Sequence, residues 1–283
     1  MSDAIQAMLI EKIRTILPMI ETATPAKTLG FLHYYLDMLE SKDEFFLSQE
    51  SYELANELLS TRDDEHFPPA LLELIRDLYE LSISEENAAA MTELGSLYYS
   101  GRHGFPQDFS KALYYYEMAA AHGDRLAQEN LGYCYYYGRS TEVDYKKAYH
   151  YFALGALDGH LISLYKLGDM YLNGLYVEKN EKEAFLIYEH CLHLIDDNNR
   201  CFASGPVHLR LGNCYLNGIG TEADAKTALL CYQIAERDLT DMILAGEIMY
   251  KHSLQAAIDG QTAARKLLME KMPQELWLDG KRP

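Results

Sequence analysis

The chain has 283 residues, of which 48% are hydrophobic, and a net charge of −18. This hydrophobic content is enough for a sizeable core, so we expect a folded protein rather than a disordered one. The excess of acidic side chains repels phosphate groups and argues against nucleic-acid binding. No run of 18 apolar residues occurs, and Glu11, Lys12 and Arg14 interrupt the apolar residues near the N-terminus. The sequence therefore predicts no membrane span and no signal peptide, and we expect a cytoplasmic location.

Residues 1–86 carry most of the negative charge, with 18 acidic and 6 basic side chains. Their apolar residues recur at helical spacing. One stripe, ahead of Pro18, consists of Ile5, Leu9, Ile13 and Ile16. Pro68 and Pro69 are expected to open a helix over residues 70–81, because proline suits the first helical position. We interpret this region as a helical cap or as degenerate repeats, with a function of its own as the alternative.

Residues 87–236 contain one pattern four times: Leu-Gly, a Tyr three residues after the Gly, a second Gly, a polar loop and an Ala in a helical run. The Leu-Gly pairs are Leu94-Gly95, Leu131-Gly132, Leu167-Gly168 and Leu211-Gly212. The tyrosines are Tyr98, Tyr135, Tyr171 and Tyr215. The second glycines are Gly101, Gly138, Gly174 and Gly218, and the alanines are Ala112, Ala148, Ala184 and Ala228. The Leu-Gly glycines are 37, 36 and 44 residues apart, and a period in this range is typical of a solenoid.

Each copy predicts two helices joined by a short loop; in the second copy we expect them over residues 129–137 and 144–157. The second glycine stands where a helix end adopts a left-handed conformation. The polar residues expected to cap the second helices are Asp108, Asp144, Asn180 and Asp224. The Leu-Gly glycine lies inside a helix, where it costs about 1 kcal/mol relative to alanine. We expect it to allow a close approach of the two helices, with the downstream alanine at the contact, and the four tyrosines to pack in the core.

This pattern resembles the Sel-one-like repeat, a relative of the tetratricopeptide repeat with a slightly longer unit. The resemblance covers residues 87–236 and implies an all-α fold, a right-handed helix-pair solenoid (an α/α superhelix). Residues 1–86 and 237–283 would be its helical caps. An insertion of eight residues separates the third and fourth copies, and we expect it to form a longer loop or an extra turn.

The pattern decays after residue 236. Leu244, Gly246 and Tyr250 echo a first helix, with residues 262–269 as its partner. Because the glycine-containing loop is missing there, we interpret residues 237–283 as capping helices and a tail.

The resemblance also places a candidate binding surface. In the tetratricopeptide relatives the first helices line a concave face, and bound peptides meet the side chains three positions before the Leu-Gly glycine and one, four and five positions after it. Transferred by this register, the groove consists of Tyr99, Glu129, Tyr133, Tyr136, Tyr137, Tyr165, Asp169, Asn173, Asn213 and Asn217. Tyrosine gives contact area at low entropic cost, and asparagine can bond to a peptide backbone. Basic or amide groups of a partner would meet the two acids.

Sequence patterns for catalysis are few. The chain has no P-loop, no dinucleotide fingerprint and no nucleophile elbow. His190, Cys191 and His193 lie close together, but no second ligand pair accompanies them, so we predict no metal site and no cofactor. The five cysteines are expected to be reduced and buried. They are Cys134, Cys191, Cys201, Cys214 and Cys231.

These observations predict a non-enzymatic adaptor or scaffold that binds a protein or peptide in the groove. One alternative is a hydrolase of the penicillin-binding type described for some secreted repeat relatives, against which the irregular cysteines argue. The other is a regulatory subunit that acts through residues 1–86.

Overall fold

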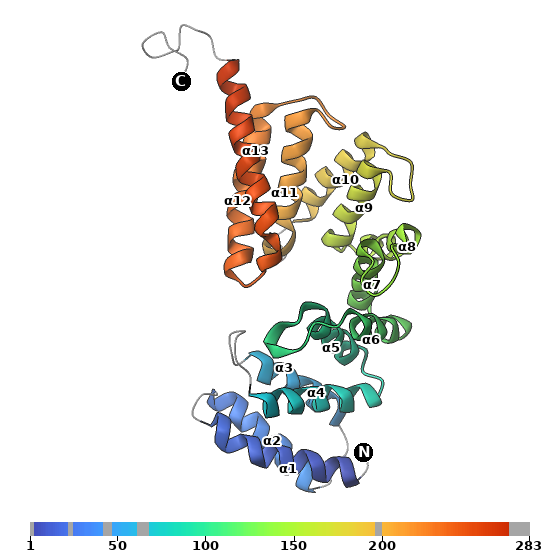
Figure 1. Cartoon of the computed structure of the whole chain (residues 1–283), viewed down its shortest axis with the longest axis vertical. Coiled ribbons are helices and arrows are strands. Elements are labelled where there is room, and N and C mark those ends of the chain that lie inside the picture. Colours follow the sequence, from blue (N-terminus) through green and yellow to red (C-terminus); the bar gives the residue numbers. More distant parts are fainter. Residues whose placement is uncertain (1–2, 22–24, 42–46, 61–67, 196–199, 272–283) are drawn as a thin grey trace. The chain divides into compact units, whose positions relative to one another are not determined.

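A computed structural model describes residues 3–21, 25–41, 47–60, 68–195 and 200–271. All regular secondary structure within these ranges is helical, which confirms the all-α fold with helical repeats predicted from the sequence (Figure 1). The chain divides into two compact units, Met1–Asp144 and Tyr145–Pro283, and each is described by itself.

The first unit holds, over its described residues, seven α-helices and one short 3-10 helix, η1. They are α1 (Asp3–Ile20), α2 (Ala26–Ser41), α3 (Leu47–Ser60), α4 (Pro69–Ser84), α5 (Ala88–Ser100), η1 (Arg102–Gly104), α6 (Phe109–Ala121) and α7 (Arg125–Tyr137). Pro69 is the first residue of α4, as predicted. Pro18 does not end α1 but lies in its last turn, where it lacks the N–H that would bond to the carbonyl four residues earlier.

The N-terminal helices of this unit pack through apolar stripes. Leu9, Ile13 and Ile16 are fully or almost fully buried on one side of α1, whereas Ile5 is exposed and does not belong to the stripe. Lys12 forms an ion pair with Asp77 that joins α1 to α4. Residues 1–86 therefore contain packed helices, and their role as a cap stays a prediction.

The second unit contains, where described, six α-helices and the 3-10 helix η2. They are α8 (Tyr145–Leu157), α9 (Leu161–Asn173), α10 (Glu181–Leu194), α11 (Arg200–Asn217), α12 (Ala225–Leu244), η2 (Ile248–Tyr250) and α13 (Lys251–Glu270). The insertion lengthens α11 to 18 residues, against 13 in α9, so the expected extra turn is present. Residues 196–199 of the insertion lie outside the described ranges.

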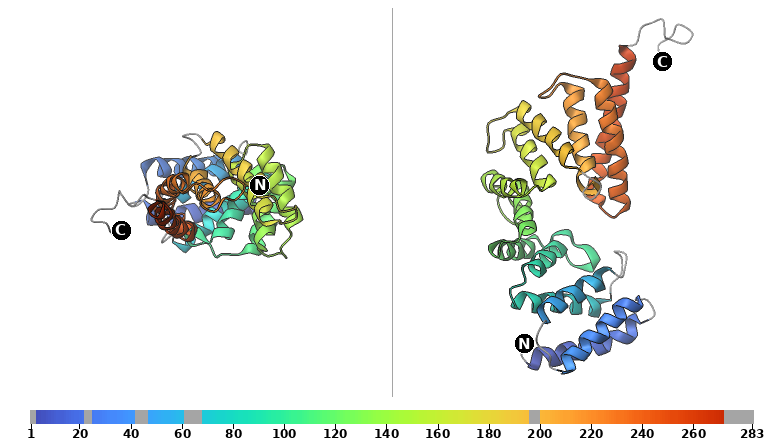
Figure 2. Two further views of the ribbon diagram at one scale, coloured as in Figure 1. Left: turned by 90° about the horizontal axis from the view of Figure 1, so that it is seen from above. Right: turned by 180° about the vertical axis from the view of Figure 1, so that it is seen from behind.

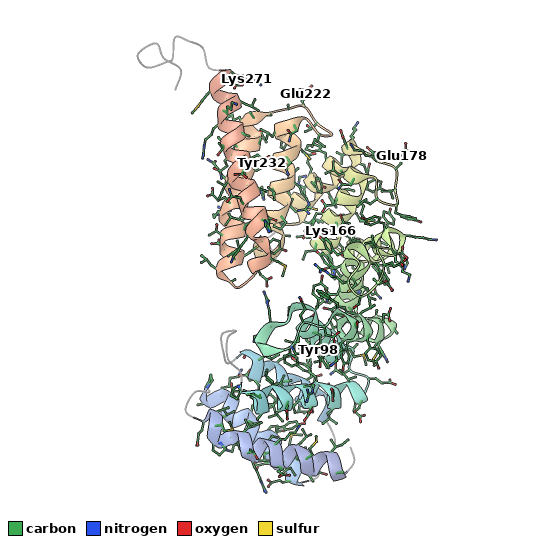
Figure 3. The ribbon with its side chains drawn as sticks, in the orientation of Figure 1. Tyr98, Lys166, Glu178, Glu222, Tyr232 and Lys271 are labelled. Atoms are coloured by element: carbon green, nitrogen blue, oxygen red, sulfur yellow. The ribbon has the colours of Figure 1, made fainter. Side chains whose placement is uncertain are left out.

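The prediction for the C-terminal elements is wrong in its boundaries. Leu244 is the last residue of α12 and Tyr250 precedes α13, so the two do not share a first helix. Residues 262–269 form the second half of α13. The helices α11, α12 and α13 lie side by side (Figures 1 and 2). The ring of Tyr232, labelled in Figure 3, lies against the backbone of both Gly212 on α11 and Gly260 on α13.

Candidate partner-binding surface

The loops between the two helices of a copy begin and end in the same way in all four copies, although the first is one residue longer and contains η1. The second glycine is left-handed each time, with φ between 66° and 69° at Gly101, Gly138, Gly174 and Gly218. The capping residue of the second helix then donates its backbone N–H to the carbonyl of the pattern tyrosine. These bonds join Asp108 to Tyr98 (2.8 Å), Asp144 to Tyr135 (2.9 Å), Asn180 to Tyr171 (2.9 Å) and Asp224 to Tyr215 (2.7 Å). The predicted side-chain caps are confirmed for Asp108, Asn180 and Asp224.

The Leu-Gly glycine lies at a tight contact, as expected, but its neighbour is a tyrosine ring and not the downstream alanine. A Cβ atom on Gly95 would lie 2.8 Å from the ring of Tyr116. A Cβ atom on Gly168 would lie 2.5 Å from the ring of Tyr188, and one on Gly212 would lie 2.7 Å from the ring of Tyr232. These tyrosines stand four residues after the alanine, so the glycine makes room for an inserted ring in three of the copies.

The hydroxyl of each inserted tyrosine bonds to the residue that follows the glycine. Tyr116 donates to Ser96 (3.2 Å), Tyr188 to Asp169 (2.8 Å) and Tyr232 to Asn213 (2.8 Å). The second copy departs from this rule, because Phe152 stands in the place of the tyrosine and Tyr133 in the place of its polar partner. The residue after the glycine is thus held by a tyrosine hydroxyl in the first, third and fourth copies, whereas in the second copy it is itself a tyrosine.

The structure corrects the predicted groove at the position three residues before the glycine. Thr92, Glu129, Tyr165 and Leu209 occupy this position, and all four are buried. Glu129 is 6% exposed and Tyr165 is 3% exposed, so the accessible role expected for these two side chains is wrong. Because this position is buried in all four copies, it belongs to the core.

The later positions of the first helices are more accessible. Tyr99, Tyr133 and Tyr136 are half-buried, and Tyr137 is 48% exposed. In the second unit Asn173, Asn213 and Asn217 are exposed. With the exception of Asp169, the predicted groove residues one, four and five positions after the glycine are therefore the ones that a partner can reach.

The groove tyrosines of the first unit belong to one aromatic surface, which we call the α7 patch. It comprises Tyr99, Phe109, Tyr133, Tyr136, Tyr137 and Arg139. The rings of Tyr133 and Tyr137 are nearly parallel with centroids 6.1 Å apart, and Tyr136 meets Tyr137 edge to face at 4.8 Å. Phe109 meets Tyr99 edge to face at 5.2 Å.

Arg139 completes the α7 patch. Its guanidinium lies 4.7 Å from the centroid of the Phe109 ring, a cation–π distance. Burial raises the pKa of Tyr99, and the neighbouring Tyr137 contributes to this rise, whereas the charge and hydrogen bond of Arg139 oppose it. Phe109 and Arg139 were not predicted, because they lie outside the first helices; the only sequence signal is their place next to Asp108 and Gly138.

Asp169 is held inside the second unit. Its carboxylate accepts two hydrogen bonds from Arg210, both 2.6 Å long, and one from Tyr188. The Nζ atom of Lys166 lies 3.8 Å away. A carboxylate with these neighbours is already neutralised, and Glu129 is buried, so neither predicted acid supports the hypothesis of a basic partner in the groove.

The asparagines of the second unit are oriented by their own helices. Asn173 and Asn217 each donate from the amide nitrogen to the carbonyl four residues earlier, at 2.7 and 2.9 Å. Asn213 accepts from Tyr232. The side chains are thus pre-oriented, which lowers the entropy lost when they bind a further group.

Ser204, His208 and Asp238 lie together but do not form a hydrolytic triad. The hydroxyl of Ser204 donates to Asp238 at 2.5 Å, and Nδ1 of His208 is 2.8 Å from the Ser204 carbonyl, to which it donates. In a triad the imidazole lies between the other two groups and accepts the proton of the serine. Ser204 is also buried. This trio therefore ties α11 to α12 and gives no support to the hydrolase alternative.

The remaining candidate groups are structural or dispersed. Cys134, Cys191, Cys214 and Cys231 are buried and form no disulfide, as predicted, and the side chain of Cys201 lies outside the described residues. His190 and His193 are exposed beside the buried Cys191. Over the residues that the structure covers, no three His, Cys, Asp or Glu side chains are grouped to hold a metal ion. Nor does any helix in those ranges have the length and apolar character to cross a membrane.

Comparison with known families and structures agrees with the repeat pattern. The Sel1 repeat model matches residues 88–124, 125–160, 161–189 and 207–237. A Sel1 repeat protein from Oxalobacter formigenes has a similar structure, with a TM-score of 0.58 and 20% identity over 91% of this chain and 99% of that chain. A protective antigen of uropathogenic Escherichia coli with an SLR fold gives a TM-score of 0.49 and 17% identity, over 84% of this chain and 60% of that chain. No match was found among curated proteins.

Sel1 repeats generally act in protein–protein interaction and are typically non-enzymatic. The matched segments correspond to the four sequence copies. In the first three copies the first helix begins at the first matched residue, and in the fourth it begins seven residues earlier. The chain is therefore a Sel1-like repeat protein.

Proposed function

We propose that this protein is a non-catalytic adaptor or scaffold that anchors a protein or peptide partner on the α7 patch. The observation that carries the proposal is the departure of the second copy from the repeat rule. There, the residues one, four and five positions after the glycine are all tyrosines. A repeat needs none of them for folding, since the other copies place Ser, Asp or Asn at the first of these positions, Tyr or Leu at the second, and Ser or Asn at the third. Breaks in a local rule concentrate at functional sites.

The chemistry of the α7 patch fits an anchor for a partner. Tyrosine rings bury a large area with few rotatable bonds and keep a hydroxyl for hydrogen bonding. Tyr137 is the most exposed tyrosine of the patch, and its ring is held on two sides by Tyr133 and Tyr136. Rigid, half-buried aromatic groups of this kind commonly dominate the free energy of binding. An apolar or amide-rich segment is the partner that this surface favours, because the α7 patch contains no acidic side chain and the nearby Glu129 is buried.

The test is the double change Tyr133→Ala and Tyr137→Ala, which removes the parallel pair of rings. The partner would be identified by affinity capture and mass spectrometry and its affinity measured by calorimetry with purified components. We expect the double variant to bind more than tenfold more weakly, since such anchors typically contribute roughly 2 kcal/mol or more each. The matched control is Tyr34→Ala, which removes an equally exposed tyrosine from α2 in the same unit.

If the double variant binds the partner as tightly as the control Tyr34→Ala does, the α7 patch is not the anchor for that partner. A loss of helical circular dichroism in the double variant would place the two rings in the core. Deletion of residues 1–86 distinguishes the regulatory-subunit alternative, in which binding disappears although the repeats remain folded.

A further inference from the structure

One loop position is left-handed in every copy. It lies two residues after the second glycine and has φ of 55° at His103, 57° at Ser140, 66° at Tyr176 and 68° at Gly220. Glycine adopts this conformation without steric penalty, whereas a bulky side chain does so rarely. The fourth copy therefore has the residue that the backbone favours, and Tyr176 is the least suitable of the four. Strain of this kind persists where a side chain is needed for something other than folding.

The side chain of Tyr176 is not buried in compensation. It is 55% exposed, and its ring centroid lies 5.5 Å from that of Tyr149 on α8. Tyr149 in turn meets the ring of Tyr171 on α9 edge to face at 6.5 Å, and the two hydroxyls are 3.4 Å apart. We call Tyr149, Tyr171 and Tyr176 the loop tyrosine cluster. All three belong to the second unit, so this surface is separate from the α7 patch.

The first copy shows which group such a ring accepts. Tyr98 is the counterpart of Tyr171, and the ammonium of Lys111 lies 4.7 Å from the centre of its ring. Lys111 stands one residue before the downstream alanine, and the third copy has Glu183 at that position. In the first copy the protein thus provides its own cation for the tyrosine ring, whereas in the third copy an acidic residue stands at the helix position of that cation.

Two acidic residues lie close to the loop tyrosine cluster in the sequence: Glu178, two residues after Tyr176, and Glu183, near the start of α10. Glu178 lies on the loop that joins α9 to α10, where Figure 3 labels it, and is exposed. Within the described parts of the chain, the side chains of Glu178 and Glu183 form no hydrogen bond or ion pair. Aromatic faces attract cations through their quadrupole, and nearby carboxylates strengthen that attraction.

We infer that the loop tyrosine cluster, with Glu178 and Glu183, is a seat for a lysine or arginine side chain of a protein partner. The loop imposes a left-handed conformation at this position in every copy, and at Tyr176 the ring that it carries lies beside Tyr149 and remains exposed to a partner. The inference does not rest on the α7 patch, since it concerns a different unit and a partner group of different chemistry.

The experiment measures binding of an acetylated penta-arginine amide by calorimetry, with penta-glutamate as the second probe. The variants are Tyr176→Gly and Tyr176→Asn, both of which suit a left-handed backbone and leave the net charge unchanged. Because the charge is the same, general attraction of the peptide to an acidic protein is the same in all variants. Tyr114→Ala, which removes a tyrosine with similar exposure from α6, is the control.

We expect both Tyr176 variants to bind penta-arginine at least fivefold more weakly than the wild type, with Tyr114→Ala unchanged. The thermal midpoint of Tyr176→Gly should be equal to or higher than that of the wild type, because a strained residue has been relieved. Equal affinity in all variants, tighter binding of penta-glutamate, or a lowered midpoint in both Tyr176 variants would overturn the inference. The last result would show that Tyr176 is retained for packing with Tyr149.

Discussion

Arg210 binds Asp169 through two parallel hydrogen bonds, from Nε and from Nη2, and so joins α11 to α9 across the insertion. The guanidinium also lies 4.3 Å from the centre of the Tyr165 ring, and its Nη1 donates to the Pro206 carbonyl. The buried Tyr165 therefore acts as a support for this ion pair, which explains why its position is closed to a partner.

Removing the acid from this pair should destabilise the protein strongly. Asp169→Ala leaves the guanidinium of Arg210 enclosed without its counter-charge, for which we expect a loss of about 3–5 kcal/mol in the free energy of unfolding. Urea denaturation measures it. The control is Lys179→Ala, which breaks the exposed ion pair with Glu181 and should change stability by less than about 1 kcal/mol. Similar effects of the two changes would contradict the role assigned to Asp169.

The same carboxylate should make stability depend on pH. Burial raises the pKa of Asp169, but the charges of Arg210 and Lys166 and the hydrogen bonds from Arg210 and Tyr188 outweigh it, so the pKa lies below its ordinary value of 3.8. A lowered pKa contributes stability above the pKa of the unfolded chain, and that contribution disappears as the pH falls through the folded value. The stability difference between wild type and Asp169→Asn should therefore be constant above about pH 5 and shrink below about pH 4. A difference that stays constant down to pH 2 would argue against this linkage.

The contact between glycine and an inserted ring can be tested with two matched glycine-to-alanine changes. Gly168→Ala places a Cβ atom 2.5 Å from the ring of Tyr188, and this overpacking should lower stability by about 1–3 kcal/mol. Gly30→Ala in α2 meets nothing within 4 Å and should raise stability by up to about 1 kcal/mol through helix propensity. Thermal or urea unfolding gives both values, and equal signs would disprove the packing argument.

The buried thiols should react slowly in the native protein. Burial raises the pKa of Cys134, Cys191 and Cys214 to about 12 and that of Cys231 to about 11, so little thiolate is present at pH 8. A time course with a chromogenic disulfide reagent should show at most one rapidly reacting thiol before denaturation and five after it. Rapid reaction of four or five native thiols would show that these side chains are accessible.

The sequence was sufficient to predict the repeat, its helix pairs and the helix-capping residues Asp108, Asn180 and Asp224, because these depend on local rules. Left-handed glycines and Asx caps act within a few residues, so Gly138 and Asp108 could be assigned from spacing alone. In the first, third and fourth copies the tyrosine four residues after the alanine, and not the alanine, lies nearest to the Leu-Gly glycine. Both residues lie on one helical stripe, and spacing does not tell which of the two reaches the glycine. The contact predicted between Gly132 and Ala148 stays a prediction.

The accessibility of the groove residues was predicted only in part, and their binding of a partner stays a prediction. Helical periodicity places Tyr165 and Asp169 on one face, but their burial depends on Arg210, which comes from the first helix of the fourth copy. The α7 patch was found through Tyr133, Tyr136 and Tyr137. Arg139 and Phe109 come from other elements and meet only through tertiary packing.

The main-chain bond between each helix cap and the pattern tyrosine has a consequence for engineering and for divergence. It uses only an N–H and a carbonyl, so this bond does not depend on which side chains the loop carries. Exposed loop residues such as Arg139 and Tyr176 can therefore be exchanged without loss of the bond, whereas Phe105, buried against Tyr98, and Gly220, where a Cβ atom would clash with the Glu181 carbonyl, are constrained by packing. New binding specificities can arise at the exposed loop positions, one copy at a time.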